Sequence, residues 1–408
     1  VVGFLLLGDK AVVQFVSKVQ DVAGNYILAA VPLFIFMGCM LERAGIAERL
    51  FDALFLWTRK LPGGLAVCTI LLGVVFAAAS GVVGATETVI GLLAIPIMMK
   101  HGYDKSLISG TICSGGSLGT VIPPSVLVII MAPVADVSVG DLFAGLLFPG
   151  LIMAALFIAY IVVRCMITPS LAPRIEIPVE DMPSWSEMIR STGFALLPPV
   201  FLIFTVLGTI LMGLATPTEA AACGAIGAAV LTALNGQFTI SVLSDAARRT
   251  MLVTAMILTI LLAGNMFAGV FIASGGISTV KDLIAALDLS TWSILLLILG
   301  LAFVAGFALD LVSVILVFVP IALPIIRTLG FDPVWFCILF LVVIQTSYLT
   351  PPMAPSIFYL RAISPPEITL RHMYRGVVPF IGLQIVTLIL VMMFPALALW
   401  LPRVLLGF

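Results

Sequence analysis

The stretch GSLGTVIPPS (116–125) decides the fold, because a second stretch, SYLTPPM (347–353), repeats its Pro-Pro pair. The two pairs are 228 residues apart, and the same offset relates the loops HGYDK (101–105) and LGFDP (329–333). Each Pro-Pro pair interrupts an apolar run. Paired Gly/Pro interruptions in corresponding halves of a chain are typical of secondary transporters built from internal repeats. The sequence therefore predicts two repeats, each with a helix broken at its Pro-Pro pair.

The composition places the chain in a membrane. Hydrophobic residues make up 62% of the 408 residues, charged residues make up 10%, and the mean hydropathy is +1.28. These values exclude a water-soluble surface and indicate an all-α polytopic membrane protein, with spans of about 20 residues each. The formal net charge is −1, and the sequence has no phosphate loop, zinc spacing or basic stripe. We therefore expect the lipid bilayer as a partner, and we expect no nucleic acid.

Two apolar blocks predict re-entrant helical hairpins. The block 64–99 is broken at ASGVVGAT (79–86), and it is barely long enough for two thin crossings. The block 290–326 repeats this plan, with its tip near AGFALDL (305–311). A re-entrant hairpin enters and leaves on one side, so its non-helical tip must be buried in protein or must line a cavity.

The other segments complete an all-α plan, with broken helices at 105–135 and 332–358. The remaining predicted elements are a partial span at 1–8, a polar connection at 9–25, a helix near 26–42, an amphipathic stretch at 45–60, a span near 143–163, a linker at 164–193, spans near 194–213 and 218–234, an amphipathic piece at 239–250, a helix at 251–273, amphipathic pieces at 277–288 and 365–376, and a final span at 377–401.

This plan divides the chain into four parts. They are a partial N-terminal span with its connection (1–25), the first repeat (26–163), a cytoplasmic linker with connecting helices (164–250), and the second repeat (251–408). The chain begins with Val inside the apolar run VVGFLLL, without Met or a basic segment. We therefore expect the N-terminus to be incomplete.

The basic residues give the two repeats opposite orientations. When each span changes side and each hairpin returns, fourteen Lys and Arg residues lie on one face and five on the other. The fourteen are Arg43, Arg49, Arg59, Lys60, Lys100, Lys105, Arg164, Arg174, Arg190, Arg248, Arg249, Arg361, Arg371 and Arg375, and the five are Lys10, Lys18, Lys281, Arg327 and Arg403. The positive-inside rule puts the fourteen in the cytoplasm. The hairpins then open from opposite sides, which predicts inverted repeats and alternating access around a midplane site.

The breaks predict an ion site, because they free backbone carbonyls. In SGGSLGTVIPPS (114–125), two prolines lack N–H groups and three glycines permit irregular backbone. A Na⁺ ion held by carbonyl and hydroxyl oxygens, including those of the hairpin tips, would satisfy the freed groups. A proline kink satisfied by neighbouring Ser, Thr and water is the structural alternative. Because the breaks hold no titratable cluster, we expect coupling to Na⁺ and not to protons.

Helix N-termini near the midplane predict an anionic substrate. The hairpin arms and the segments after both breaks each begin a helix, and a helix N-terminus offers unpaired N–H groups with a partial positive charge. We expect a small organic carboxylate, contacted from Ser114, Ser125 and the two tips. Asp310 at the second tip is the strongest acidic candidate for this site, with a buried helix cap or a structural pair as the alternative.

Two other acidic residues lie inside apolar stretches. Glu219 follows Thr216 and Pro217 in the pattern of a capping box with proline in the first turn, so we expect it to cap a helix. Glu87 begins the second arm of the first hairpin. Its charge at a helix N-terminus explains this position as well as ion chemistry does.

A match to a catalytic motif gives a remote alternative. Residues 115–119 read G-G-S-L-G and match the nucleophile elbow G-x-S-x-G. That motif needs a strand–turn–helix context and a base near the serine. The two histidines, His101 and His372, fall in a loop and an interfacial segment. An intramembrane hydrolase is therefore a remote reading, and we do not expect an enzyme.

Three segments resemble one family over essentially the whole chain. GLATPTEAAA (213–222), GYDKSL (102–107) with the first Pro-Pro stretch, and LPIIRTLGFDP (323–333) with the second resemble the large membrane (permease) subunit of tripartite ATP-independent periplasmic (TRAP) transporters. The resemblance implies a multi-pass protein of the bacterial inner membrane that imports organic acids with Na⁺ by an elevator mechanism. Its implied partners are a small membrane subunit and a periplasmic substrate-binding protein.

The same resemblance implies two sodium sites. The first would map to Ser80, Gly119, Ile122 and Pro124, and the second would map to Gly306, Ser347, Thr350 and Met353. A stand-alone Na⁺/anion symporter of the same architecture is the near alternative, and a channel-like scaffold is a more distant one.

Overall fold

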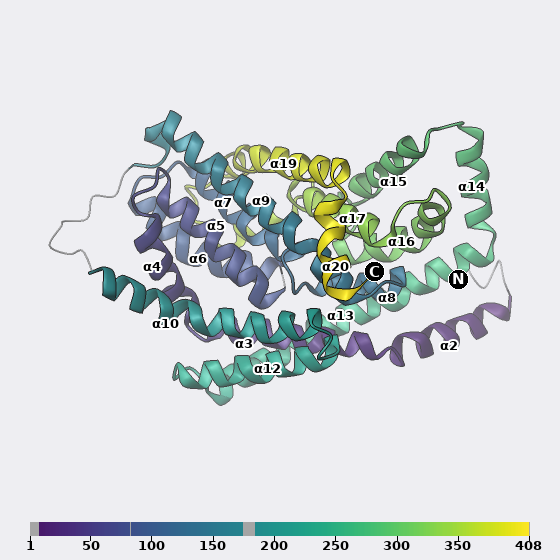
Figure 1. Ribbon diagram of the computed structural model, residues 1–408, viewed down its shortest axis with the longest axis horizontal. Helices are drawn as coiled ribbons and strands as arrows, with labels where there is room; N and C mark the ends of the chain where they lie inside the picture. Colours follow the sequence, from purple (N-terminus) through teal and green to yellow (C-terminus); the bar gives the residue numbers. More distant parts are fainter. Residues whose placement is uncertain (1–7, 82, 174–183, 408) are drawn as a thin grey trace.

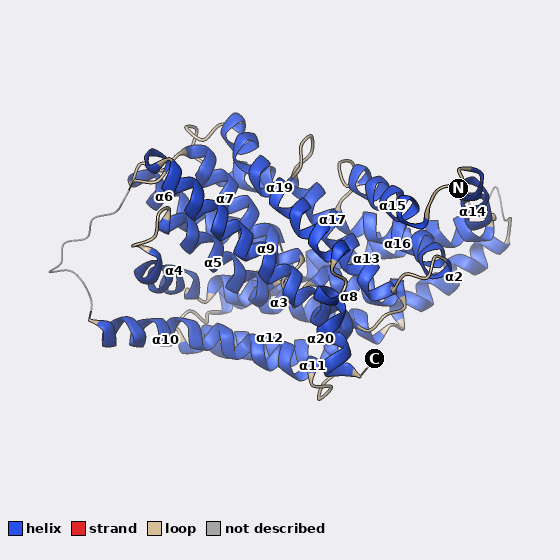
Figure 2. Cartoon of the chain, turned by 45° about the horizontal axis from the view of Figure 1, so that its top comes forward, coloured by secondary structure: helices blue, strands red, loops and turns tan. Residues whose placement is uncertain are grey.

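The structure is a computed structural model that describes residues 8–81, 83–173 and 184–407. Those residues form helices joined by loops and contain no strand (Figure 2). The α-helices are α2 (Lys10–Ala23), α3 (Ala30–Arg43), α4 (Ile46–Thr58), α5 (Gly64–Ser80), α6 (Val83–Lys100), α7 (Lys105–Ser117), α8 (Val126–Ala135), α9 (Val139–Ile167), α10 (Trp185–Ile203), α11 (Thr209–Leu211), α12 (Pro217–Leu234), α13 (Ile240–Ala273), α14 (Gly276–Ala286), α15 (Thr291–Ala305), α16 (Leu311–Thr328), α17 (Pro333–Leu349), α18 (Pro355–Ile363), α19 (Leu370–Met393) and α20 (Ala396–Leu406). Within the described ranges, seven helices are long and apolar enough to cross a membrane. The predicted all-α polytopic fold is confirmed.

Two layers make up the molecule. Helices α2, α3, α10 and α12 run along the lower side in Figure 1, and α5, α6, α7, α9 and α19 lie above them. In the lower layer α3 packs against α12 and α13, while α4 packs against both α5 and α10 and so joins the layers. The upper layer contains the predicted hairpins and broken helices. The candidate site therefore lies in the upper layer.

The 228-residue repeat of the sequence is also a repeat of local structure. Helix α6 (Val83–Lys100) corresponds residue for residue to α16 (Leu311–Thr328), and the starts of α7 and α17 correspond in the same way. The Asp104 carboxylate accepts two backbone N–H groups of α7 at 2.9 and 3.0 Å. Asp332 caps α17 in the same way, at 2.8 and 3.1 Å. Equivalent short polar sequences thus start equivalent helices.

Both predicted helix breaks are present. The first separates α7 from α8 and contains the 3₁₀ turn η2 (Leu118–Thr120), while the second is the shorter gap between α17 and α18. The Pro123–Pro124 and Pro351–Pro352 peptide bonds are both cis. Because proline has no N–H group and crowds the preceding turn, neither helix continues through its Pro-Pro pair.

The hairpin and the broken helix of the first repeat both start at one end of helix α9. At 29 residues α9 is about 43 Å long, since an α-helix rises 1.5 Å per residue. Near the C-terminus of α9, Cys165 lies against Gly63, the residue before α5. Its sulfur is 2.8 Å from the position that a Cβ on Gly63 would occupy. Just beyond α9, the Leu171 carbonyl accepts the Asp104 N–H at 2.8 Å, directly before α7. Helices α5 and α7 therefore both start at the C-terminal end of α9.

The hairpin and the broken helix of the second repeat start at the opposite end of α9. Near the N-terminus of α9, Gly145 lies so close to Ile338 in α17 that a Cβ there would collide with the isoleucine side chain. In α15, the ring of Trp292 contacts the Trp335 ring of α17, with centroids 6.1 Å apart. Helices α15 and α17 therefore start at the N-terminal end of α9. The two repeats enter from opposite ends of one spanning helix, as the predicted inversion requires.

One polar contact joins equivalent positions of the two repeats. Gln345 Nε2 donates a hydrogen bond to Ser117 Oγ at 3.3 Å, and both side chains are buried. The two residues are 228 positions apart, so each is the counterpart of the other. Equivalent residues meet where a pseudo-two-fold axis passes between two repeats. This contact places the axis between α7 and α17.

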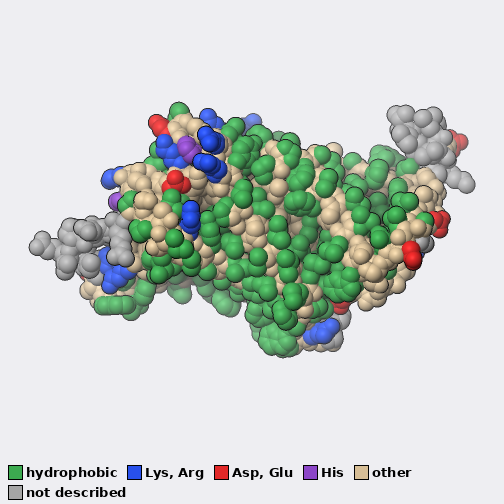
Figure 3. Space-filling view, turned by 90° about the horizontal axis from the view of Figure 1, so that it is seen from above, with side chains coloured by type: hydrophobic (Ala, Val, Ile, Leu, Met, Phe, Trp, Pro, Cys, Tyr) green, Lys and Arg blue, Asp and Glu red, His purple; other side chains and the backbone are tan. Residues whose placement is uncertain are grey.

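The basic side chains gather as the topology predicts. Figure 3 shows Lys and Arg concentrated toward the end where Figure 1 places α4 and the start of α10. At the opposite end of α9, Arg327 Nη2 donates to the Ala135 carbonyl at 3.3 Å. Arg174 lies outside the described residues. The division of the chain into four parts stays a prediction.

Several expected elements were wrong in detail. The polar connection expected at 9–25 is mostly the helix α2, because its apolar residues recur with helical spacing. The separate pieces expected at 239–250 and 251–273 form one 34-residue helix, α13, since no Pro or Gly intervenes between them. The final span expected at 377–401 is interrupted, because α19 ends at Met393, shortly before Pro395, and α20 follows. The partial span predicted at 1–8 lies almost wholly outside the described residues.

Candidate functional site

The first hairpin tip packs directly against the first break. Helix α5 ends at Ser80, and Gly81 follows with a positive φ of 62°. The Gly81 carbonyl accepts the Val126 N–H at 3.4 Å, and a Cβ on Gly81 would lie 2.7 Å from the Pro124 carbonyl oxygen. Only glycine fits there without strain, because the left-handed backbone and the close approach both oppose a side chain. The tip therefore places Gly81, the residue after Ser80, directly against Pro124.

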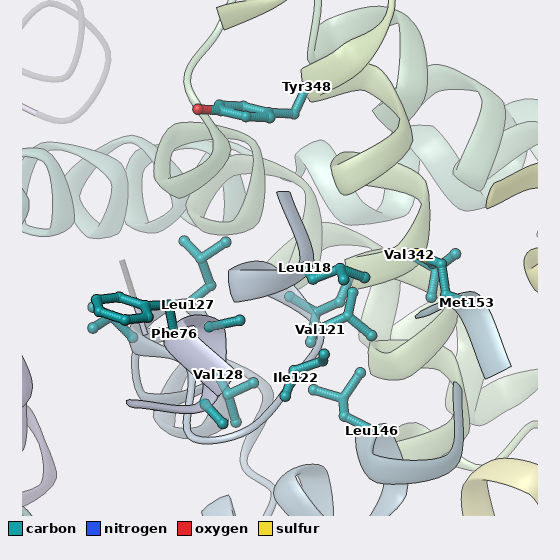
Figure 4. Close-up of a cluster of buried hydrophobic side chains, with 14 of the residues drawn as sticks. Phe76, Leu118, Val121, Ile122, Leu127, Val128, Leu146, Met153, Val342 and Tyr348 are labelled. Carbon is teal, nitrogen blue, oxygen red and sulfur yellow. The ribbon is translucent and has the colours of Figure 1, made fainter. Parts of the chain in front are cut away.

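The remaining residues of the first set lie in the same buried break. Ser80 Oγ and Thr86 Oγ1 are 2.8 Å apart, and both side chains are buried. Gly119 belongs to η2, and the Ile122 N–H donates to the Leu118 carbonyl at 2.8 Å. Figure 4 shows the Ile122 side chain among apolar neighbours, so its backbone carbonyl is the atom that could bind an ion.

The second hairpin tip packs against the second break. A Cβ on Gly306, the residue that ends α15, would collide with the hydroxyl of Ser347 in α17. Ser347 Oγ donates to the Ile344 carbonyl at 2.7 Å, and Thr350 Oγ1 donates to the Thr346 carbonyl at 2.6 Å. A hydroxyl whose proton is committed to the backbone still has lone pairs available. Both oxygens are therefore suited to a cation.

Met353 differs from the rest of the second set. Its side chain is 48% exposed, whereas Ser347 is fully buried. It lies just before Ala354, which has a positive φ of 40°. Any contribution of Met353 to an ion site would come from its backbone carbonyl, since a thioether sulfur is a poor ligand for a hard cation. The structure brings Gly306 and Ser347 together, and the Na⁺ assignment of both sets stays a prediction.

The predicted substrate residues have different surroundings. Ser114 is buried within α7, and its hydroxyl donates to the Gly110 carbonyl at 2.5 Å. Ser125 precedes α8, is 1% exposed, and has a hydroxyl without a hydrogen-bond partner. An unpartnered buried hydroxyl is unusual, and a ligand is one explanation. Ser125 is therefore the stronger of the two serine candidates.

Asp310 serves as a helix cap in this structure. Its carboxylate accepts the N–H groups of Val312 and Ser313 at 3.1 and 3.4 Å, at the start of α16. The residue is exposed, so the alternative of a protein-buried cap is wrong, although the capping itself is present. Whether Asp310 also contacts substrate stays a prediction. Glu219 forms the capping box expected with Thr216.

Glu87 is the polar residue whose importance the sequence left undecided. It lies past the first turn of α6 and has no exposed surface. Tyr348 Oη donates to Glu87 Oε2 at 3.4 Å, while Oε1 has no hydrogen-bond partner. An acidic residue within an apolar hairpin was the available signal. Its neighbours come from the other repeat, so the sequence could not identify them.

The serine of the catalytic-motif match has no base beside it. Ser117 Oγ donates to the Ser114 carbonyl at 2.9 Å and accepts from Gln345. His372 instead interacts with Thr369 at the start of α19, with 3.1 Å between its Nδ1 and the Thr369 N–H nitrogen. The alternative of an intramembrane hydrolase therefore finds no support in the described geometry.

Comparisons with known proteins agree with this architecture. A family model described as "Tripartite ATP-independent periplasmic transporter, DctM component" matches residues 1–397. The chain is 30% identical over 402 residues to the C4-dicarboxylate TRAP transporter large permease protein DctM of Pseudomonas aeruginosa, covering 98% of this chain and 91% of that protein. It is 31% identical over 407 residues to the ectoine/5-hydroxyectoine TRAP transporter large permease protein UehC of Ruegeria pomeroyi, with coverages of 98% and 92%.

A solved structure shares the fold. The chain resembles the Alcanivorax borkumensis YdaH transporter with a TM-score of 0.67 and 16% identity, over 97% of this chain and 90% of that chain. The family match and both relatives describe transporter subunits and not enzymes. This chain belongs to the DctM component family of the tripartite ATP-independent periplasmic transporters, as a large permease subunit.

Proposed function

We propose that this subunit imports a small organic carboxylate together with Na⁺. The observation that carries the proposal is the pairing of a hairpin tip with a broken helix in both repeats, Gly81 with Pro124 and Gly306 with Ser347. Each pairing gathers carbonyl and hydroxyl oxygens in a buried place. Neutral oxygens of this kind suit a hard monovalent cation.

The carboxylate class is supported by the helix N-termini at the site. Helix α8 begins beside the first pairing with the unpartnered Ser125 hydroxyl, and α16 begins near the second tip. A carboxylate would accept from N–H and O–H donors at such ends and would match their partial positive charge. One relative is named for C4-dicarboxylate, which agrees with this class.

The family match supports a proposal for the partners and the transport cycle. We propose that a periplasmic substrate-binding protein delivers the carboxylate, and that a small membrane subunit assembles with this chain in the bacterial inner membrane. The upper layer with both hairpins would move against the lower layer as an elevator. The inverted arrangement supports this, because exchanging the shapes of two inverted repeats turns an inward-open form into an outward-open one.

The test is uptake into proteoliposomes that contain this subunit with its cognate partners. Uptake is expected to require a Na⁺ gradient and to continue when the pH gradient is removed. Thr350→Ala removes one hydroxyl ligand of the second pairing, so it should raise the Na⁺ concentration needed for half-maximal uptake. Thr259→Ala is the matched control, because Thr259 makes the same kind of bond to a carbonyl four residues earlier, at 2.7 Å, on α13.

Three results would count against the proposal. An unchanged Na⁺ response in the Thr350 variant, with transport intact, would make the second break a kink and not an ion site. Uptake by this subunit without any binding protein would favour the alternative of a stand-alone symporter. A substrate screen that returned only cations or neutral sugars would contradict the carboxylate class.

A further inference from the structure

Glu87 lies where the first hairpin meets the second broken helix. It projects from α6, and α6 packs against both α7 and α18. On the α7 side, a Cβ on Gly116 would collide with the Glu87 side chain. On the α18 side, the Tyr359 ring covers Gly84. The nearest ring atom is 2.7 Å from the position that a Cβ on Gly84 would occupy. The carboxyl group is therefore enclosed by elements of both repeats.

The hydrogen bonds around this carboxyl are incomplete. Tyr348 Oη donates to one oxygen at 3.4 Å, and the other oxygen has no partner. The Ser356 hydroxyl, in the first turn of α18, lies beside the same carboxyl and is also fully buried without a well-aligned partner. The Ser356 hydroxyl can complete the hydrogen bonding of this carboxyl in two ways, as a donor to an ionised carboxylate or as an acceptor from a protonated one. Tyr348 belongs to the same buried cluster as Leu118 and Ile122, and Figure 4 shows its ring apart from those two side chains.

No basic side chain balances the charge. The groups that face Glu87 from the packed elements are Cys113 of α7, Tyr348 of α17, and Ser356 and Tyr359 of α18, and none of these described residues carries a positive charge. An ionised carboxylate in such a place is costly unless it is paired or binds a cation. Burial at this place therefore favours a neutral carboxyl or a bound cation over a bare carboxylate.

We propose that Glu87 is a proton-binding site at the junction of the two repeats, loaded when α6 and α18 are packed together. A proton on Oε1 makes that atom a donor to Ser356 Oγ, while Oε2 continues to accept from Tyr348. Donation by Ser356 to an ionised carboxylate would also satisfy both atoms, but it would leave an uncompensated buried charge that the added proton removes. A metal cation fits less well, because hard cations such as Ca²⁺ gather about six or more oxygens, whereas the hydroxyls beside this carboxyl are those of Tyr348 and Ser356.

The site adds a pH dependence to the proposed Na⁺ coupling. At alkaline pH the carboxyl loses its proton, and the ionised form favours separation of α6 from α18. Uptake at saturating Na⁺, with equal pH on both sides, should therefore fall several-fold from neutral to alkaline pH. In Glu87→Gln the amide can still donate to Ser356 and accept from Tyr348, so uptake should persist and become insensitive to pH. Glu48→Gln, at an exposed carboxyl on α4, should behave as the wild type.

An infrared titration of the purified protein gives a readout that needs no substrate. The wild type should show the carbonyl band of a neutral carboxylic acid near neutral pH, at constant Na⁺, and Glu87→Gln should lack it. A spectrum without this difference overturns the proposal, and so does a Glu87→Gln variant whose uptake keeps the wild-type pH profile. Loss of the band on adding Na⁺ at fixed pH would identify a sodium ligand instead, which also overturns it. Because the titration involves no transport, its outcome is independent of whether the proposed Na⁺-coupled uptake holds.

Discussion

Ser347 occupies the space in which a side chain on residue 306 would lie, so glycine is the residue that fits there. Replacing Gly306 by Ala would put a methyl group against the Ser347 hydroxyl and 2.8 Å from its Cβ, which is fixed on α17. Overpacking of this kind typically costs about 1–3 kcal/mol of stability. We expect Gly306→Ala to lower the melting temperature of the purified protein and to weaken the Na⁺ dependence of uptake.

Gly300→Ala is the matched control for this substitution. Gly300 lies in the same helix, α15, and no atom approaches within 4 Å of the place of its Cβ. Alanine there should preserve uptake and leave stability unchanged or slightly higher, since alanine favours a helix over glycine. Equal effects of the two substitutions would mean that the contact between the tip and Ser347 is unimportant.

Single residues were predictable where their role depends on neighbours in the sequence. The caps at Glu219 and Asp104 follow from patterns of three or four residues, and the Gly81 turn follows from a small residue at a helix end. The environment of Glu87 was not predictable, because its partners Tyr348 and Ser356 are more than 200 residues away in the chain. A pattern in one helix cannot reveal which distant helix packs against it.

At the scale of helices, two equivalent caps start the broken helices of the two repeats. The Asp104 and Asp332 carboxylates each accept two backbone N–H groups of the helix that follows. Replacing an N-cap Asp by Ala typically costs about 0.5–2 kcal/mol. We expect each of Asp104→Ala and Asp332→Ala to lower the thermal stability of the purified protein by a similar amount.

The double variant tests whether the caps act independently. Their helices start at opposite ends of α9, so the two losses should add, as they do for distant sites. A double variant no less stable than the singles would show that the two helix starts are coupled. Asp9→Ala is a suitable control, because the Asp9 side chain precedes α2 without making a capping hydrogen bond.

Helix boundaries were predictable where a breaker residue marks them. The Pro-Pro pairs end α7 and α17 near the expected positions, and the Gly-containing tips separate the arms of both hairpins. A change from amphipathic to apolar sequence did not end a helix, since α13 runs through residue 250 without interruption. Hydrogen bonding along a helix continues through such a change, because it joins backbone groups and does not depend on which side chains are apolar.

At the scale of the whole molecule, the inverted arrangement fixes which residues share a side of the membrane. Lys100 ends α6 beside the start of the first broken helix, and Lys281 lies on α14, next to the second hairpin. Both are exposed. If the basic end faces the cytoplasm, a membrane-impermeant thiol reagent should label Lys281→Cys in cells whose outer membrane has been made permeable.

The same reagent should reach Lys100→Cys only after the inner membrane is opened. The background for both variants should carry Cys223→Ser, because Cys223 is the free cysteine that is exposed among those described. Labelling of both positions from the same side would contradict the inversion of the two repeats. Labelling with the sides exchanged would leave the inversion standing and would reverse the orientation in the membrane.

The hydrogen bond between Ser117 and Gln345 makes the two halves unlike at the place where they should be most alike. If the same residue stood at both positions, exchanging the shapes of the halves would leave this contact unchanged. Here a short hydroxyl faces a long amide whose Oε1 lacks a partner. The exchange therefore does not return an equivalent arrangement. Under alternating access, this contact would therefore differ in energy between the two forms of the empty carrier, before any ion gradient acts on it.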